Sequence, residues 1–422
     1  MPRGLGAETA ARPPGGHGRR ARAGRARGAG RDVSAATEPV RFREALRAVL
    51  PTFLAVRLGT LVLGLLSVGL FPPLDPVSVP GWPAPPMPDP GWHALFTAWE
   101  RFDALWFLRI AEHGYATGDG SAAFFPLYPM AVRLVSTLLG GHPLAAALLV
   151  SNAAFLLALA VVYDLARSER SGSVARTTVL LLATFPTAFF FLAPYSEPLF
   201  LLLAALAFRA ARRGRWAVAG AAGLGAALTR NVGAIVAVAL AAEAFQRRRE
   251  GERCLARGLL AAVAAASGTL LYLASWQLRS GDLLAPLHQQ ATWQRSFSWP
   301  WSTLAQATRI AFRYVGQTNG PYWLIDWVLV VPVLAVSVLA LVRYRWIFSV
   351  YLWGGLLLPL SFVFPDRPLM SMPRFVLPLF PAFWAAAEVL ERQRVPPWAA
   401  AAVGAAGLGL LLPLYVGWYY IF

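Results

Sequence analysis

Long runs of Leu, Ala, Val and Phe constrain this chain more than any other feature of its sequence. Of its 422 residues, 57% are hydrophobic, whereas soluble domains have roughly 45–50% apolar residues on a similar count. Many of the runs approach the roughly 17–25 residues that a helix needs to cross the hydrocarbon core of a bilayer. The sequence therefore predicts an all-α integral membrane protein with many spans.

Eleven segments are expected to cross the membrane. They are residues 48–71, 144–165, 177–193, 197–209, 216–229, 231–245, 258–277, 323–342, 346–364, 374–390 and 397–420. Basic residues fill the connections at 167–176, 209–215, 246–253, 343–345 and 391–394. With eleven spans and a cytoplasmic N-terminus, all of these connections fall in the cytoplasm, as the positive-inside rule requires.

This arrangement places two large loops outside, at about 72–143 and 278–322. Segment 124–140 is apolar enough to span, but counting it would move the basic connection 167–176 outside. We therefore interpret 124–140 as an interfacial or re-entrant helix within the first loop. The helices expected within 197–245 are short for a bilayer of about 30 Å, so they require local thinning or burial in the bundle.

The basic character of the chain has an ordinary explanation. The net charge is +17, and all 38 basic residues are Arg. Such a surplus can indicate nucleic-acid binding, but Arg in cytoplasmic connections explains it better, and no nucleic-acid partner is expected. Residues 1–47 are rich in Gly, Ala, Arg and Pro and show no apolar periodicity, which predicts a disordered cytoplasmic tail. We interpret this tail as a topology determinant, in preference to a segment that binds anionic lipid or RNA.

Asp103 is an acid among large apolar residues in the stretch FDALWFLRIAEHGY (102–115). On a helical wheel it shares a face with Trp106, Phe107 and Ile110. It has no basic partner at the i+3 or i+4 position, and a carboxylate on an apolar face is costly unless another group meets it. A general base would explain this placement, and so would a helix N-cap. The residues alone leave both interpretations open.

Further charged candidates lie at the other outer positions. Glu112 and His113 either contact a phosphate-linked ligand or are solvated. Glu197 either serves a site or begins a helix, where the dipole favours an acid. Arg230 lies in the middle of a long apolar stretch and therefore needs an anion, for which a phosphate is suited. Arg374 is a second candidate for a phosphate contact, although a residue on the rim is the simpler interpretation.

The second large loop is rich in aromatic residues. These are Trp293, Trp299, Trp301, Tyr314, Tyr322 and Trp323. Such residues anchor loops at a membrane interface, and they also stack on sugar rings. Metal chemistry has less support, since Cys254 is the single cysteine and no spacing of His or paired carboxylates indicates a metal site. No metal or cofactor is expected.

Five segments together resemble a known family. RFDALWFLRIAEHGY (101–115) and SAAFFPLYPMAVRL (121–134) are similar to the first luminal loop of the GPI mannosyltransferase II family. APYSEPLFLLLA (193–204) and LTRNVGAI (228–235) are similar to its next two motifs, and MPRFVLPLFPAFW (372–384) resembles its C-terminal Arg-Phe segment. Phe102 stands where the family usually has Trp.

The resemblance implies a GT-C glycosyltransferase, with many membrane spans and a polyprenyl-phosphate sugar as donor. Asp103 then corresponds to the catalytic acid/base in the first outer loop, while Arg230 and Arg374 would hold the donor phosphate. The motifs also carry substrate-binding candidates, which are Tyr195, Glu197, Asn231, Glu112 and His113.

We therefore expect residues 48–422 to form an enzyme of the bacterial plasma membrane. It would transfer mannose, with inversion, from polyprenyl-phosphate-mannose to an extracytoplasmic hydroxyl of a glycolipid, polysaccharide or protein, with Asp103 as base. No G-x-G-x-x-G or P-loop motif indicates a nucleotide-dependent scheme. The alternatives are a flippase or transporter of lipid-linked sugars, which would need polar groups through the bilayer, and a sugar-binding scaffold without catalysis.

Overall fold

The computed structural model describes residues 42–83, 91–292, 294–318 and 320–421. The chain divides into Met1–Ala36 and Thr37–Phe422, and all described residues belong to the second unit. The expected disordered tail, residues 1–47, lies outside the described residues except for its last six, which begin the first helix.

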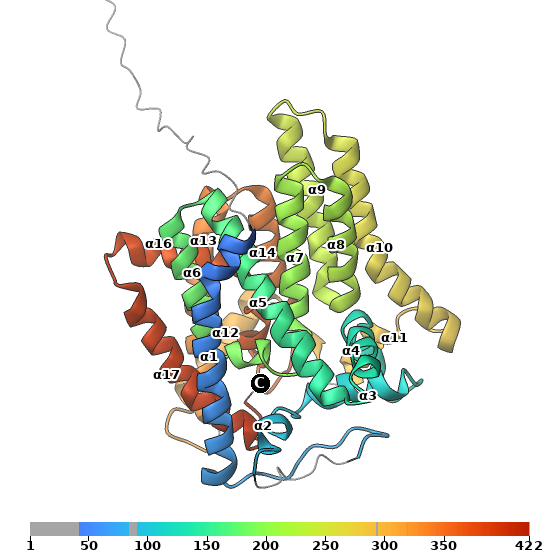
Figure 1. The fold of residues 1–422 in the computed structure, drawn as a ribbon, viewed down its shortest axis with the longest axis vertical. Helices are drawn as coiled ribbons and strands as arrows, with labels where there is room; N and C mark the ends of the chain where they lie inside the picture. Colours follow the sequence, from blue (N-terminus) through green and yellow to red (C-terminus); the bar gives the residue numbers. More distant parts are fainter. Residues whose placement is uncertain (1–41, 84–90, 293, 319, 422) are drawn as a thin grey trace, which may run out of the picture. The chain divides into compact units, whose positions relative to one another are not determined.

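Helices make up nearly all of the regular structure in the described residues (Figure 1). The helices in the predicted spans are α1 (Phe42–Leu70), α5 (Pro143–Glu169), α6 (Gly172–Thr184), α7 (Glu197–Arg212), α8 (Trp216–Thr229), α9 (Ala234–Arg249), α10 (Leu255–Ser280), α13 (Gly320–Arg343), α14 (Trp346–Leu360), α16 (Phe380–Arg392) and α17 (Pro397–Val416). The loops and corners carry α2 (Ala94–Thr97), α3 (Asp103–His113), α4 (Leu127–Leu138), α11 (Ala285–Thr292), α12 (Pro300–Arg313), α15 (Met372–Phe375) and three short 3₁₀ helices. A two-stranded antiparallel sheet joins β1 (Ser296–Phe297) to β2 (Phe362–Val363).

Five helices in the described part of the chain are long and apolar enough to cross a membrane, namely α1, α5, α10, α13 and α17. The other helices in the predicted spans are shorter. For example, α8 has 14 residues and is therefore about 21 Å long. The sequence correctly predicted short helices within 197–245, and α6, α14 and α16 are short as well. A membrane protein with many helices is confirmed, whereas the count of eleven spans stays a prediction.

Four predicted spans, those of α6, α14, α16 and α17, extend at least four residues beyond their helices, and proline explains the end of α6. Helix α6 ends at Thr184, because Phe185 precedes Pro186 and adopts the extended ψ of 142° that this position favours. Helix α14 ends at Leu360, one residue after Pro359. Helix α16 begins only at Phe380, after the short helix α15. Segment 124–140 forms the separate 12-residue helix α4, as expected for a helix within the first loop.

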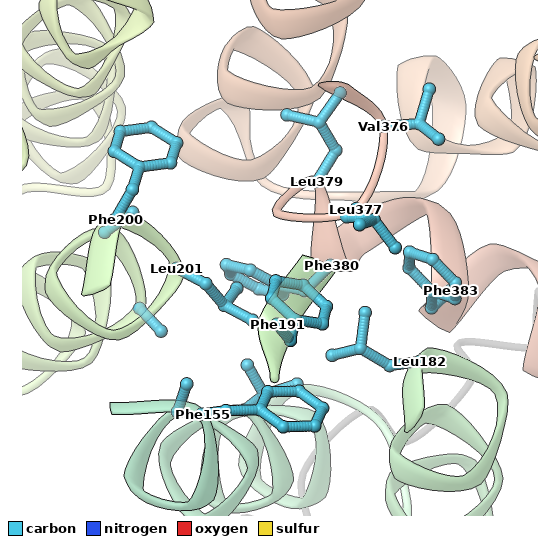
Figure 2. Close-up of a cluster of buried hydrophobic side chains, with 14 of the residues drawn as sticks. Phe155, Leu182, Phe191, Phe200, Leu201, Val376, Leu377, Leu379, Phe380 and Phe383 are labelled. Carbon is cyan, nitrogen blue, oxygen red and sulfur yellow. The ribbon is translucent and has the colours of Figure 1, made fainter. Parts of the chain in front are cut away.

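Apolar packing around α5 holds the centre of the bundle. α5 packs against α1, α4, α6 and α7, and more than half of its apolar stretch is buried. Figure 2 shows Phe155 of α5 facing Phe191, with Phe380 and Phe383 of α16 beside them. The rings of Phe155 and Phe191 stack with their centroids 4.5 Å apart. This core fixes α7, which begins at Glu197, and the segment directly after α15, the short helix that carries Arg374. Glu197 and Arg374 belong to the site described below.

The basic connections meet at one end of the bundle, which we call the arginine end. Asp164 at the end of α5 pairs with Arg209 and Arg213 at the end of α7. The buried Glu243 of α9 pairs with Arg212 and, across to the start of α14, with Arg345. Ion pairs with Glu388 of α16 add Arg170 and Arg343 to this end. Together with the pair of Arg345 and Glu250, these contacts join four of the five basic connections, whereas their cytoplasmic location stays a prediction.

Helix α7 begins at Glu197, at the end of the bundle opposite the arginine end. Because α7 has 16 residues, it separates Glu197 from the arginine end by about 24 Å. The helices α2, α3 and α4 of the first loop lie at the Glu197 end (Figure 1).

Candidate active site

A cavity of about 380 Å³ lies at the Glu197 end of the bundle. Its charged lining residues are Asp103, Arg230, Arg295 and Arg374. Aromatic side chains complete much of the wall, among them Trp106, Phe107, Phe124, Phe125, Phe364, Phe375 and Tyr420. The first large loop, the end of α8 and the two segments next to β1 and β2 therefore converge on one space.

Asp103 is the first residue of α3, and the N-cap position belongs to Phe102. No side-chain hydrogen bond caps this helix, so the interpretation of Asp103 as an N-cap is wrong. Its Oδ2 instead accepts a hydrogen bond of 2.6 Å from Nη1 of Arg374. The side chain is 24% exposed and lines the cavity together with Trp106 and Phe107. A negative charge here is also favoured by the N-terminal end of the helix dipole.

The backbone before Asp103 adopts an unusual conformation. Phe102 has φ 53° and ψ −121°, a region that residues with a side chain rarely adopt and that costs on the order of 1–3 kcal/mol. Its ring is held by Tyr415, Trp418 and Tyr420, with ring centroids 5.9, 5.2 and 5.3 Å away. The surrounding aromatic residues thus fix the direction in which α3 presents Asp103.

Four charged residues form what we call the ion-pair network. Its members, in spatial order, are Asp103, Arg374, Glu197 and Arg230. Nε of Arg374 lies 2.9 Å from Oε1 of Glu197, and Nη1 of Arg230 lies 2.6 Å from the same oxygen. Glu197 is fully buried, whereas the side chains of Arg230 and Arg374 are 11% and 14% exposed. The sequence placed these residues on four separate motifs, and the structure brings them together.

The network changes the interpretation of the two arginines. We expected an anion for Arg230, and the structure supplies Glu197. Arg374 is not a rim residue, because it is enclosed between Asp103 and Glu197. Glu197 begins α7, which was one of its two interpretations. From that position it also pairs with Arg230 and Arg374. Both arginines still line the cavity.

Tyr195 and Asn231 flank this network. The Tyr195 hydroxyl is buried and donates a hydrogen bond of 3.1 Å to the carbonyl of Arg101. The Arg374 guanidinium lies 5.4 Å from the Tyr195 ring, so Tyr195 supports Arg374 from behind the cavity wall. Asn231 lines the cavity itself, and its Oδ1 accepts a hydrogen bond from the backbone N–H of Val232.

Glu112 and His113 are not brought to the cavity. Both are exposed and lie at the C-terminal end of α3, about 15 Å along the helix from Asp103. His113 contacts the ring of Trp82 and lines a separate cavity of about 650 Å³.

The sequence reasoning missed Arg295, which lines the cavity from the second large loop. Its Nη1 donates a hydrogen bond of 3.2 Å to the carbonyl of Phe362, and its guanidinium lies 5.6 Å from the Phe375 ring. It forms no ion pair with a carboxylate in the described part of the chain. Burial lowers the pKa of Arg295 to about 10, so the side chain remains protonated at neutral pH. The sequence feature that could have identified Arg295 is its place in the second large loop, which is rich in aromatic residues.

The loop aromatics that the sequence singled out lie outside the cavity lining. Trp299 and Trp301 stack on each other, with centroids 4.8 Å apart and planes 11° from parallel. Trp323 donates a hydrogen bond to the carbonyl of Asp366, and the Tyr322 ring lies near Arg367. Trp293 falls outside the described residues.

The side chains that could hold a metal ion are those of His, Cys, Asp and Glu. Within residues 42–421, apart from the undescribed positions, no three of these side chains lie close enough together to hold a metal ion.

Comparisons with known proteins bear directly on the first four motifs. Residues 73–245 match the family model described as "Mannosyltransferase (PIG-V)", which includes Asp103, Glu197 and Arg230. Arg295 and Arg374 lie beyond the matched segment. No curated protein matches the chain significantly.

Two solved structures show a distant likeness. One is ArnT from Cupriavidus metallidurans bound to undecaprenyl phosphate, with 14% identity, 88% of this chain and 76% of that chain covered, and a TM-score of 0.48. The other is the oligosaccharyltransferase AglB from Archaeoglobus fulgidus in complex with an inhibitory peptide and a dolichol-phosphate, with 12% identity, coverages of 86% and 55%, and a TM-score of 0.39.

TM-scores below 0.5 do not establish a common fold, so the assignment rests on the family match and on the motifs within it. The chain is therefore a membrane glycosyltransferase, and its residues 73–245 are similar to the mannosyltransferase (PIG-V) family.

Proposed function

We propose that this enzyme transfers mannose from a polyprenyl-phosphate-mannose to a hydroxyl of an extracytoplasmic glycolipid, polysaccharide or protein. The helical bundle would then be of the GT-C type. The proposal rests on the position of Asp103. Its carboxylate lines the cavity and accepts a hydrogen bond from Arg374 on one side.

Asp103 acts as the general base in this scheme. Its carboxylate takes the proton of the acceptor hydroxyl while the hydroxyl oxygen forms a bond to C1 of the sugar. The bond between C1 and the phosphate oxygen breaks, and the lipid phosphate leaves with the bonding electrons. Attack opposite the leaving group inverts the configuration at C1. The arginines of the cavity stabilise the charge that develops on the leaving phosphate.

Arg374 and Glu197 are positioning residues. Arg374 contacts Asp103 and Glu197 through different nitrogen atoms, which fixes the plane of its guanidinium group. Glu197 is fully buried and also holds Arg230. A base held in this way keeps its orientation without reorganisation during the reaction.

The distribution of charge supports an extracytoplasmic site. Arginine-rich connections favour the cytoplasmic side, and they meet at the end of the bundle opposite Glu197. We infer a bacterial plasma-membrane protein whose N-terminus is cytoplasmic and whose cavity opens on the outer side.

The catalytic assignment is tested with membranes that contain either the wild type or Asp103→Asn, incubated with radiolabelled polyprenyl-phosphate-mannose. The variant should lose on the order of 10²–10⁴ of the transfer rate, as expected on loss of a general base. Asp282→Asn is the matched control, because Asp282 is a partly exposed acid that pairs with His288 outside the cavity. Full transfer by Asp103→Asn would refute the role of Asp103. Lipid translocation by wild type without any transfer would instead favour the flippase alternative.

Sidedness is tested with single cysteines in a Cys254→Ser background. Gln317→Cys and Arg253→Cys both place the thiol at exposed positions, in the second large loop and at the arginine end. A membrane-impermeant maleimide should label Gln317→Cys in intact cells and Arg253→Cys only after permeabilisation. The reverse pattern would contradict the proposed orientation.

A further inference from the structure

The cavity holds one positive charge that no carboxylate neutralises. Arg230 and Arg374 share Glu197, and Arg374 also meets Asp103. Three guanidinium groups thus face two carboxylates. Arg295 is the group left over, since it bonds only to a backbone carbonyl in the described structure. Arg295 is half-buried, and a partly buried cation without a carboxylate partner loses hydration that a bound anion would replace.

A patch of exposed aromatic side chains adjoins Arg295. We define the aromatic patch as Phe297, Trp299, Trp301 and Phe362, which are 60, 56, 64 and 45% exposed. The rings of Phe297 and Trp299 meet edge to face, and so do those of Phe297 and Phe362. Exposed apolar clusters of this kind mark binding or membrane-contact surfaces.

The small β-sheet connects this patch to the cavity. Phe297 of β1 pairs with Phe362 of β2. Arg295 directly precedes β1, and Phe364 directly follows β2, and both of these residues line the cavity. The hydrogen bond from Arg295 to the Phe362 carbonyl ties the two sides together. A ligand whose polar group contacts Arg295 could therefore place an apolar group on the aromatic patch, which begins two residues further along the chain at Phe297.

We propose that Arg295 binds the phosphate of the lipid-linked donor and that the lipid chain leaves the cavity across the aromatic patch. This inference rests on the proposed function for the identity of the donor class. A sugar phosphodiester carries one negative charge, which matches the one unneutralised guanidinium group. Arg is also the side chain best suited to phosphate oxygens, because it offers paired N–H groups.

The chemistry of the patch favours a hydrocarbon chain over a sugar. Its four side chains provide only two polar groups, the indole N–H groups of Trp299 and Trp301. A sugar that lost its water there would leave several hydroxyl groups without partners. The stacking of Trp299 on Trp301 also covers one face of each ring. An isoprenoid chain has no hydroxyl groups to satisfy and gains from burying apolar area.

The test measures the dissociation constant of polyprenyl phosphate, with a short and with a long chain, for the purified protein in nanodiscs. Arg295→Gln should weaken binding of both ligands on the order of 10- to 100-fold, as expected for loss of a hydrogen bond between charged groups. Arg295→Lys keeps the charge and should recover part of the loss. The Trp299→Ala/Trp301→Ala double variant should weaken the long-chain ligand about tenfold or more and leave the short-chain ligand nearly unchanged.

Two control variants match these substitutions. Arg313→Gln removes an exposed arginine of α12, and Trp398→Ala removes a tryptophan of α17 that is 70% exposed. Neither residue lines the cavity, and both variants should bind as the wild type does. Thermal unfolding of each variant shows whether it is folded.

Several outcomes would overturn the inference. Unchanged affinity of Arg295→Gln would exclude Arg295 from the phosphate site. Equal weakening of both ligands by the tryptophan variant would exclude a chain-binding patch, and no weakening of either would show that the patch only anchors the loop. Because polyprenyl phosphate is measured by binding alone, failure of the mannose-transfer assay would remain a separate result.

Discussion

Nη1 of Arg374 lies 2.6 Å from Oδ2 of Asp103, although 271 positions separate the two residues in the chain. Nε of the same arginine contacts Glu197, so one guanidinium group joins the first large loop to the start of α7. The orientation of Asp103 therefore depends on three distant segments at once.

Arg374→Gln should lower both kcat and stability. The substitution removes the positive charge that Asp103 and Glu197 share. Breaking a buried ion pair typically costs about 3–5 kcal/mol of stability. Arg374→Lys restores the charge but lacks the planar fork that reaches two carboxylates, so stability should partly recover while kcat stays low. Thermal unfolding in detergent and the mannose-transfer rate are the two measurements. Full recovery of kcat in Arg374→Lys would show that charge alone is sufficient. Arg133→Gln, which removes an exposed arginine of α4, is the control.

Glu197→Gln should destabilise the protein because it leaves Arg230 with no carboxylate partner at the position observed here. The double variant Glu197→Gln/Arg230→Gln should then be more stable than the sum of the single effects implies. The expected coupling is about 0.5–3 kcal/mol, as for other residues in direct contact. Unfolding free energies of the four proteins in the cycle measure it. Additive effects would show that the contact between the two residues contributes nothing.

Phe102→Trp should keep transfer activity, because an aromatic ring can remain among Tyr415, Trp418 and Tyr420. Phe102→Ile should be less stable than Phe102→Leu. Both substitutions remove the ring, but a β-branched side chain tolerates the positive φ of 53° less well. The difference should be about 1–3 kcal/mol, read from thermal unfolding. Equal stability of the two aliphatic variants would mean that the backbone relaxes.

Gly268→Ala should displace α8 from α10. A Cβ at this position would lie 2.5 Å from the carbonyl oxygen of Leu224 and 2.9 Å from Cβ of Ala227. Since α8 ends next to Arg230, we expect weaker donor binding as well as a lower melting temperature. Gly409→Ala is the control, because nothing lies within 4 Å of its Cβ position. That substitution should be neutral or stabilise α17 by about 0.5–1 kcal/mol.

Glu100→Gln should raise stability at neutral pH. Burial raises the pKa of Glu100 above its ordinary value, so the folded state favours the protonated form. Stability from this group is present at low pH and is lost as pH rises through the folded-state pKa. Gln avoids that loss, and its oxygen can still accept the hydrogen bond from Nε1 of Trp82. The advantage of the variant should shrink as pH falls toward the ordinary range of Glu, which a series of melting curves would show. An advantage that is the same at every pH would contradict this explanation.

The helices could be predicted from the sequence because each depends on a local run of apolar residues. Even there, proline decided boundaries that hydropathy could not, as at Pro186 after α6. The short helix α4 was also predictable, since counting it as a span would have broken the charge pattern of the connections. These features are properties of neighbouring residues.

The sequence by itself determined the membrane class, the order of the helices and the family motifs that contain Asp103, Glu197 and Arg230. Only the tertiary structure decided which charges meet. Arg374 was a candidate phosphate contact or a rim residue, and it instead holds Asp103. Arg295 was not singled out from the sequence, and it lines the cavity. The physical reason is that an ion pair depends on distances of a few ångströms between side chains, and packing of the whole bundle sets those distances across hundreds of residues.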